Sequence, residues 1–115
     1  MACASFDMAE AGKADLPIAC SLPEPGFAVR RKEVHEILCR RLRTEELADG
    51  YAFEFDGAPE TARRLVDFIT AERSCCPFFL FELIFQPGEG SIWLRVRGPE
   101  GTKEFAREGL VTSSE

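Results

Sequence analysis

Two adjacent cysteines are the residues of this sequence with the clearest capacity for chemistry. Cys75 and Cys76 stand side by side in the segment ERSCCPFF, residues 72–79. Thiolates are soft ligands, so two neighbouring thiols can bind one soft ion such as Hg(II), As(III) or Cu(I). The same pair can also form a strained vicinal disulfide that is easily reduced, as in a redox switch. A third interpretation is structural, because free cysteines are among the most buried residue types.

The charged residues around the pair bear on its reactivity. Helical spacing places Glu72 one turn before Cys76, and Arg73 three residues before it. The carboxyl end of a helix is negative, which disfavours a thiolate and raises the pKa of a cysteine there. Activation therefore needs a nearby cation. Arg73 is the candidate closest in sequence, and Arg95 or Arg97 could approach from the segment that follows.

The other cysteines give weaker signals. There are five cysteines in all, an odd number, so they cannot all pair in intramolecular disulfides, and their spacing matches no common zinc pattern. Cys20 ends an apolar run and could complete a three-thiol site if that run lies beside residues 78–85. Cys39 stands four residues after the only histidine, His35, but two ligands do not make a metal site. Cys3 carries no assignment.

Two helices are expected, and the cysteine pair lies at the end of the second. Pro59 suits the first turn of this helix, and Pro77 disfavours helical geometry at Cys76, where the helix should end. Its apolar stripe consists of Ala62, Leu65, Val66 and Ile69. Another helix is predicted over residues 27 to about 43, where apolar residues recur at helical spacing. Its other faces carry charged residues, including Arg30, and are expected to face solvent.

A β-hairpin is expected directly after the cysteine pair. The apolar residues 78–85, a turn with proline and glycine, and the alternating residues 92–97 supply its strands. One register gives a wholly apolar face and sets Glu82 opposite Arg95, a favourable pair. Its remaining pairs are Leu80–Arg97, Phe81–Val96, Leu83–Leu94, Ile84–Trp93 and Phe85–Ile92. The second face, which carries Trp93, could serve as a homodimer interface.

Three further segments complete the expected elements. The apolar residues 16–20 predict a first strand, and residues 51–55 alternate as in a strand with one buried face. Residues 102–109 predict a short helix with Phe105 facing inward. The predicted order is β-α-β-α-β-β-α. This order favours an α+β two-layer sandwich, with the helices on one face of a mixed or antiparallel sheet.

Length and composition limit the classes of protein. The 115 residues, of which 45% are hydrophobic, suit a single domain, expected over residues 15–110 between a flexible tail, 1–14, and a C-terminal tail, 111–115. The net charge of −6 disfavours nucleic acid as a partner. No apolar run has the length of a membrane span, and the N-terminus lacks signal-peptide features, so we expect no membrane partner and a reducing cytoplasm. The glycine-rich nucleotide motifs are absent, so no organic cofactor is indicated.

The segment ERSCCPFFLFEL, residues 72–83, resembles a group of short bacterial proteins with a Glu-Arg-x-Cys-Cys-Pro-Phe motif, associated with heavy-metal resistance settings. The similarity extends along the chain to residues 18–20, 49–53, 92–94, 98–101 and 103–105. The resemblance implies that Cys20, Cys75 and Cys76 belong together as one set. It does not name a reaction.

The sequence therefore predicts a binding site for a soft metal or metalloid ion, used for sequestration or transfer. Its ligands would be Cys75 and Cys76, with Cys20 as a candidate third ligand and Glu72 and Arg73 in support. A thiol–disulfide redox enzyme or sensor using the same pair is the first alternative. A non-catalytic module for dimerisation or interaction is the second. Whether the protein is an enzyme stays open.

Overall fold

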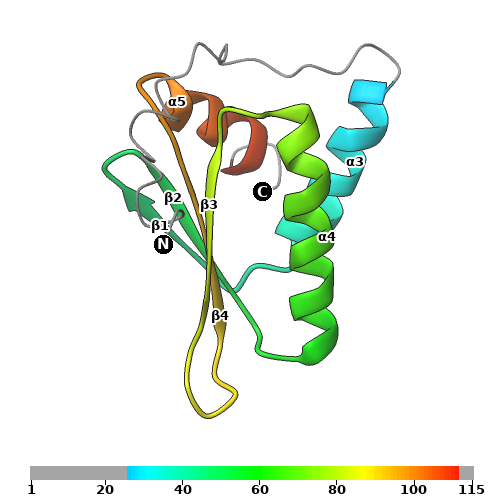
Figure 1. Ribbon diagram of the computed structural model, residues 1–115, viewed down its shortest axis with the longest axis vertical. Helices are drawn as coiled ribbons and strands as arrows, with labels where there is room; N and C mark the ends of the chain where they lie inside the picture. Colours follow the sequence, from blue (N-terminus) through cyan, green and yellow to red (C-terminus); the bar gives the residue numbers. More distant parts are fainter. Residues whose placement is uncertain (1–25, 112–115) are drawn as a thin grey trace, which may run out of the picture.

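The computed structural model describes residues 26–111, which contain helices and a four-stranded sheet (Figure 1). In chain order the elements are α3 (Gly26–Leu38), β1 (Arg43–Leu47), β2 (Gly50–Phe55), α4 (Pro59–Cys75), β3 (Leu80–Phe85), β4 (Ile92–Arg97), α5 (Thr102–Ala106) and the π-helix η1 (Arg107–Val111). The protein is an α+β protein, as predicted. The strand predicted at residues 16–20, Cys3, Cys20 and both predicted tails lie outside the described residues, except for Val111.

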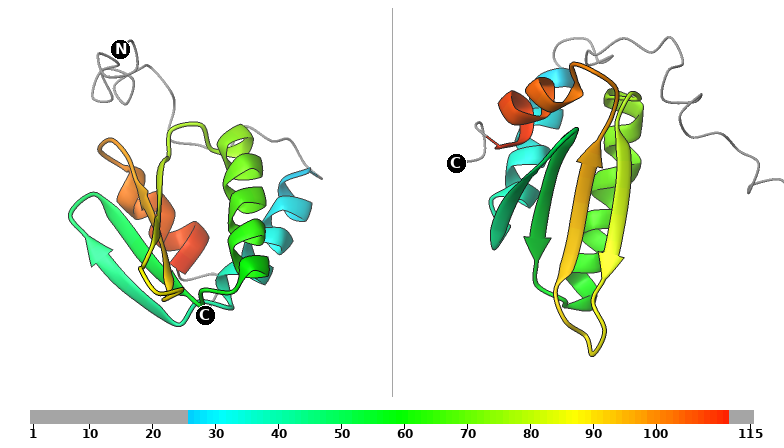
Figure 2. Two further views of the ribbon diagram at one scale, coloured as in Figure 1. Left: turned by 60° about the horizontal axis from the view of Figure 1, so that its bottom comes forward. Right: turned by 90° about the vertical axis from the view of Figure 1, so that its left-hand side faces the viewer.

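The sheet has the strand order β1-β2-β4-β3, and each neighbouring pair is antiparallel. The register of the β3–β4 hairpin is the predicted one at every pair, with Phe85 opposite Ile92 and Glu82 opposite Arg95. The apolar side chains on one face of this hairpin specified that register. Figure 2 shows α3, α4 and α5 on the same side of the sheet.

The first described helix is shorter than predicted. Helix α3 ends at Leu38, and residues 43–47 form the strand β1, which the predicted order omits. The sequence of β1, RTEEL, lacks apolar alternation, and its side chains are exposed or half-buried. This strand exists because it pairs with β2 through a tight turn. Leu42, one of the apolar residues that recur at helical spacing in the predicted helix, lies beyond the end of α3 and is 64% exposed.

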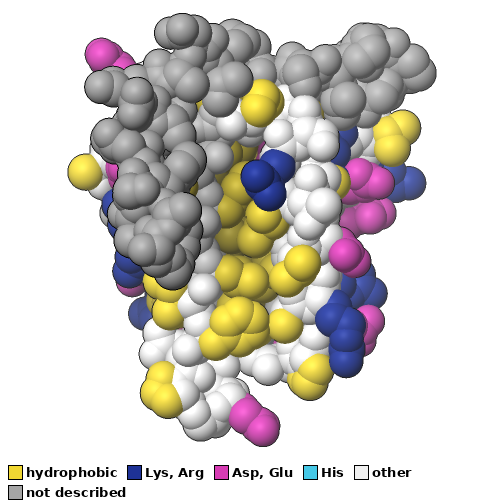
Figure 3. Space-filling model, in the orientation of Figure 1, with side chains coloured by type: hydrophobic (Ala, Val, Ile, Leu, Met, Phe, Trp, Pro, Cys, Tyr) yellow, Lys and Arg dark blue, Asp and Glu magenta, His cyan; other side chains and the backbone are white. Residues whose placement is uncertain are grey.

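Helix α4 begins at Pro59 and ends at Cys75, as predicted. Its buried stripe differs from the expected one, because Val66 is 49% exposed, whereas Ala62 and Ile69 are partly buried against the core. The buried positions recur at helical spacing and are Leu65, Phe68, Glu72 and Cys75. A carboxylate thus occupies a core position. On the face in Figure 3, hydrophobic side chains gather between α4 and β3.

The last described segment packs against the first described helix. Phe105 in α5 is half-buried, as predicted, and its ring meets the ring of Phe78 edge-on, with centroids 5.0 Å apart. The chain then continues as η1, which contacts α3. Residues of α3, α5, η1 and the end of α4 thus lie around the cysteine pair. No helix within residues 26–111 combines the length and apolar character needed to cross a membrane.

Candidate thiol site

The cysteine pair marks the end of α4. Cys76 caps this helix with φ −128° and ψ 76°, and its backbone N–H still donates to the carbonyl oxygen of Glu72 at 2.7 Å. Pro77 follows and stops the helix, as predicted. The two sulfurs lie close together, since the thiol of Cys76 donates to Sγ of Cys75 at 3.6 Å. Both side chains are buried.

The two cysteines differ in redox state. Cys75 is disulfide-bonded, whereas Cys76 is a free thiol. The bond at Cys75 is therefore not the vicinal one that the sequence suggested. A free thiol next to a disulfide sulfur is the arrangement from which thiol–disulfide exchange begins.

Burial dominates the electrostatics of the pair. It raises the pKa of the Cys76 thiol to about 12, and the negative charge of Glu72 acts in the same direction. Burial also raises the pKa of Glu72, which is only 3% exposed, against the opposing effect of Arg30. The pKa of the Cys76 thiol is thus raised, which is the direction predicted for a cysteine at the carboxyl end of a helix. Its main cause is burial.

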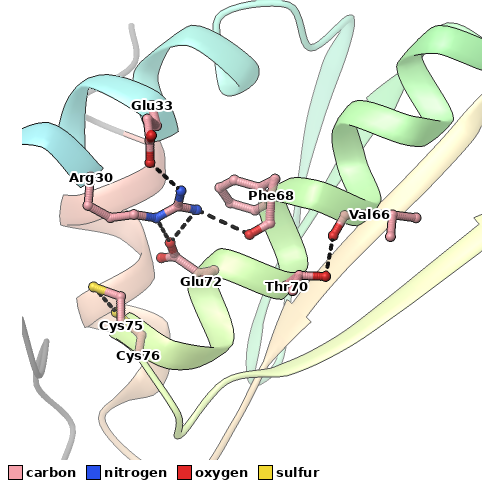
Figure 4. A network of polar contacts seen from close by, with 8 residues as sticks. All are labelled: Arg30, Glu33, Val66, Phe68, Thr70, Glu72, Cys75 and Cys76. Carbon is pink, nitrogen blue, oxygen red and sulfur yellow. Dashed lines mark hydrogen bonds and ion pairs between the residues drawn. The ribbon is translucent and has the colours of Figure 1, made fainter.

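A buried arginine is bonded to Glu72. The Nε of Arg30 donates to Oε1 of Glu72 at 2.9 Å, and its Nη2 lies 2.9 Å from the same oxygen (Figure 4). Nη2 also donates to the carbonyl oxygen of Phe68 at 3.1 Å, and Nη1 donates to Oε1 of Glu33 at 2.8 Å. Buried charges persist in proteins when they are paired and hydrogen-bonded in this way. We call Arg30 and Glu72 the buried ion pair.

Sequence reasoning missed this ion pair. It assigned Arg30 to a solvent-facing side of the first helix and named Arg73, which is exposed, as the nearby cation. A signal for Arg30 was present, because it precedes the buried Val34 and Ile37 by four and seven residues and so shares their helix face.

The two alternative cations of the hairpin have other partners. Arg97 Nε lies 3.0 Å from Oε1 of Glu82, and Arg97 Nη1 lies 3.4 Å from Oδ1 of Asp49. Arg95 lies 3.9 Å from Glu82, its predicted cross-strand partner. Of Arg30, Arg95 and Arg97, it is Arg30 that pairs with Glu72, the carboxylate beside Cys76.

A cavity of about 610 Å³ opens beside the pair. Cys75, Cys76, Glu72 and Arg30 contribute to its polar side. Its apolar lining comes from other elements and includes Val34, Phe105 and Leu110. The cavity therefore joins two sulfurs and a neutralised ion pair to an apolar wall.

Within residues 26–111, no group of three or more His, Cys, Asp and Glu side chains is arranged to hold a metal ion. His35 and Cys39, at helical spacing in the sequence, are both exposed, and the Cys39 thiol donates to the carbonyl oxygen of Glu36 at 3.3 Å. Cys20 lies outside the described residues. The three-thiol site of Cys20, Cys75 and Cys76 therefore stays a prediction.

No protein-family model matches this chain, and neither the curated proteins nor the solved structures give a significant match. The resemblance to bacterial proteins with the Glu-Arg-x-Cys-Cys-Pro-Phe motif also stays a prediction.

Proposed function

We propose that this protein binds a soft metal or metalloid ion through Cys75 and Cys76 in their reduced state, for sequestration or transfer. The observation that carries the proposal is the separation of 3.6 Å between the two sulfurs, beside a cavity of about 610 Å³. Thiolates select soft ions over hard ones. The cavity gives such an ion a route to both sulfurs.

The sulfur separation favours one coordination geometry. An ion bonded to both sulfurs at about 2.3 Å, the zinc–thiolate length, would have an S–ion–S angle of about 100°. A linear two-coordinate ion would need sulfurs about 4.6 Å apart at the same bond length. The pair therefore suits a pyramidal or tetrahedral centre, such as As(III), better than a linear one.

Binding requires that the disulfide of Cys75 is first reduced. Two thiols of a cellular reductant supply two electrons and two protons, become a disulfide themselves and leave Cys75 and its former partner as thiols. We place the protein in the reducing cytoplasm, where such thiols are abundant. Cys20 is our candidate third ligand, and Glu72 and Arg73 support the site in this proposal.

The position of the site follows from a proposed two-layer α+β sandwich. Helices α3, α4 and α5 would form one layer and the sheet the other. The edge-on contact between Phe68 of α4 and Phe81 of β3, with centroids 6.4 Å apart, supports this arrangement. The pair would then lie in the helical layer, where α4 turns towards the sheet.

Native mass spectrometry of the reduced protein tests the proposal. The protein is titrated with As(III), Hg(II), Cu(I) and Zn(II), beside the double variant Cys75→Ser/Cys76→Ser. We expect one As(III) per chain, lost in the double variant and kept in the control variant Cys39→Ser, whose cysteine is exposed. Equal affinity of the double variant and the unmodified protein for every ion would overturn the proposal.

A thiol–disulfide redox role is the second candidate, favoured by the free thiol of Cys76 at 3.6 Å from the disulfide-bonded Cys75. In the exchange, the Cys76 sulfur attacks Cys75, a vicinal disulfide forms, and the former partner of Cys75 leaves as a thiol. No external oxidant is needed. The raised pKa of Cys76 opposes this step, because the thiolate is the attacking species.

Graded glutathione buffers test the redox role. Starting from the fully reduced protein, oxidised glutathione in these buffers accepts two electrons and two protons, so the redox role predicts a reversible mass loss of two hydrogen atoms and a vicinal disulfide in the peptide map. The internal exchange leaves the mass unchanged and is detected by the peptide map alone. If no disulfide between Cys75 and Cys76 forms at any glutathione redox potential, the redox role is excluded. The proposal of metal binding is unaffected by that result.

A further inference from the structure

The cavity beside the thiols has an apolar wall that an inorganic ion would leave unused. Val34 of α3 and Leu110 of η1 are buried core residues, and Phe105 of α5 is half-buried with its ring packed on Phe78. All three line the same cavity as Cys75 and Cys76. An organic group in this cavity would remove apolar surface from water, which favours binding.

The valence of a pyramidal centre gives this wall a role. Trivalent arsenic forms three bonds, and the two sulfurs 3.6 Å apart can supply two of them. Within the described part of the chain, no third ligand group is arranged with them. A carbon substituent satisfies the third valence without another thiol.

On these grounds, and resting on the function proposed above, we propose that the reduced pair of Cys75 and Cys76 takes arsenic(III) compounds with one organic substituent. Both sulfurs bond to arsenic, and the substituent lies against the apolar wall of Val34, Phe105 and Leu110.

The buried ion pair beside the thiols agrees with a neutral adduct; the other charged residues that line the cavity are Arg31, Lys32 and Glu108. The buried ion pair of Arg30 and Glu72 balances its own charge, with contacts of 2.9 Å. An organoarsenic(III) centre held by two thiolates is also neutral and adds no charge to this region. Cu(I) held by two thiolates would add one negative charge beside the buried Glu72, which is costly.

The binding step balances without an oxidant or a reductant. A compound R–As(OH)₂ reacts with the two thiols of Cys75 and Cys76. Two As–S bonds form, two As–O bonds break, and each thiol proton leaves with a hydroxide as water. Arsenic stays trivalent throughout. The preceding reduction of the Cys75 disulfide is the step described above, with a cellular thiol as reductant.

The test compares three arsenic(III) probes on the reduced full chain: hydrated phenylarsine oxide, methylarsonous acid and arsenite. Native mass spectrometry gives stoichiometry, and competition with a small dithiol gives dissociation constants. We expect a one-to-one phenylarsenic adduct with loss of two waters, at least about tenfold tighter than the methyl adduct, because the ring buries more apolar surface. Cys20→Ser should change the phenyl affinity less than about twofold, because two sulfurs suffice for this ligand.

A matched pair of variants distinguishes the contribution of the apolar wall to binding affinity from the contribution of the thiols. Val34→Thr keeps the side-chain shape and places a hydroxyl at the wall, whereas Val29→Thr makes the same change on α3 at a side chain that is 59% exposed. We expect Val34→Thr to weaken phenylarsenic binding by about five- to tenfold and to leave arsenite unchanged, and Val29→Thr to change neither. Circular dichroism confirms that both variants fold.

The possible outcomes distinguish this inference from the proposed function. Equal affinity for the phenyl and methyl probes in the unmodified protein overturns the inference, as does an equal effect of Val34→Thr on all three probes. In either case, dithiol-dependent arsenite binding would leave the proposed function standing. If no arsenic(III) probe binds, or if Cys75→Ser/Cys76→Ser binds all of them unchanged, the proposed function fails as well.

Discussion

At the scale of single residues, burial separates the two free thiols among residues 26–111. Cys39 is exposed, whereas Cys76 is buried and its pKa is raised to about 12. The thiolate is the reactive form, and at pH 8 it is a very small fraction of Cys76. We therefore predict that iodoacetamide at pH 8 modifies Cys39 at least about tenfold faster than Cys76, as measured by peptide mass spectrometry. Equal rates would show that Cys76 is accessible.

The buried ion pair predicts a large stability effect from one residue. In Arg30→Met, the carboxylate of Glu72 loses its buried partner, and we expect the free energy of unfolding to fall by about 3–5 kcal/mol. Urea unfolding followed by circular dichroism measures it. The control Arg63→Met, at an exposed position of α4, should change it by at most about 0.5 kcal/mol. Arg30→Met/Glu72→Met should recover much of the loss. A single variant as stable as the control would contradict the prediction.

At the scale of elements, the features that could be predicted from the sequence are those that local residue patterns determine. The β3–β4 register was predictable because its apolar face and the pair of Glu82 with Arg95 agree on one alignment. Strand β1 was not predictable from the sequence, since its residues include good helix formers and show no alternation of apolar and polar side chains. The ion pair was missed because it joins residues 42 positions apart, and only the packing of α3 on α4 brings them together.

Gly50 is required by the pairing of β2 with β4. A Cβ atom at this position would fall on the carbonyl oxygen of Val96 in the neighbouring strand. We predict that Gly50→Ala lowers stability by roughly 1–3 kcal/mol, read as a lower melting temperature. Gly109→Ala, in η1, meets nothing within 4 Å and should leave stability unchanged or raise it by up to about 1 kcal/mol. A neutral Gly50→Ala would contradict the observed strand register.

At the scale of the whole molecule, ligand binding and folding are linked. The cavity joins α3, α4, α5 and η1, so its apolar wall exists only in the folded chain. Phenylarsine oxide at 100 times its dissociation constant should stabilise the reduced protein by up to about 2.7 kcal/mol, less any affinity for the unfolded dithiol. Thermal unfolding measures the shift, which Cys75→Ser/Cys76→Ser should abolish. A bound ligand with no shift would mean that the wall contributes nothing.

The dimerisation alternative also belongs to this scale. Trp93 on β4 is half-buried, and the guanidinium of Arg43 lies 5.4 Å from the centre of its ring. A dimer through this face predicts a sedimentation mass that rises with concentration and that Trp93→Glu lowers. A constant monomer mass over the micromolar range would exclude it.

The order of the cavity walls along the chain has a consequence for synthesis. Cys75 and Cys76 end α4, whereas Leu110 belongs to η1, which follows the hairpin and α5. A ribosome therefore releases the two thiols before it releases the segment that completes the cavity wall beside them. A growing chain presents a bare dithiol to soft electrophiles in its surroundings. Completion of the fold then buries the two side chains and forms the apolar wall, so the thiols of the finished protein are reached through the cavity.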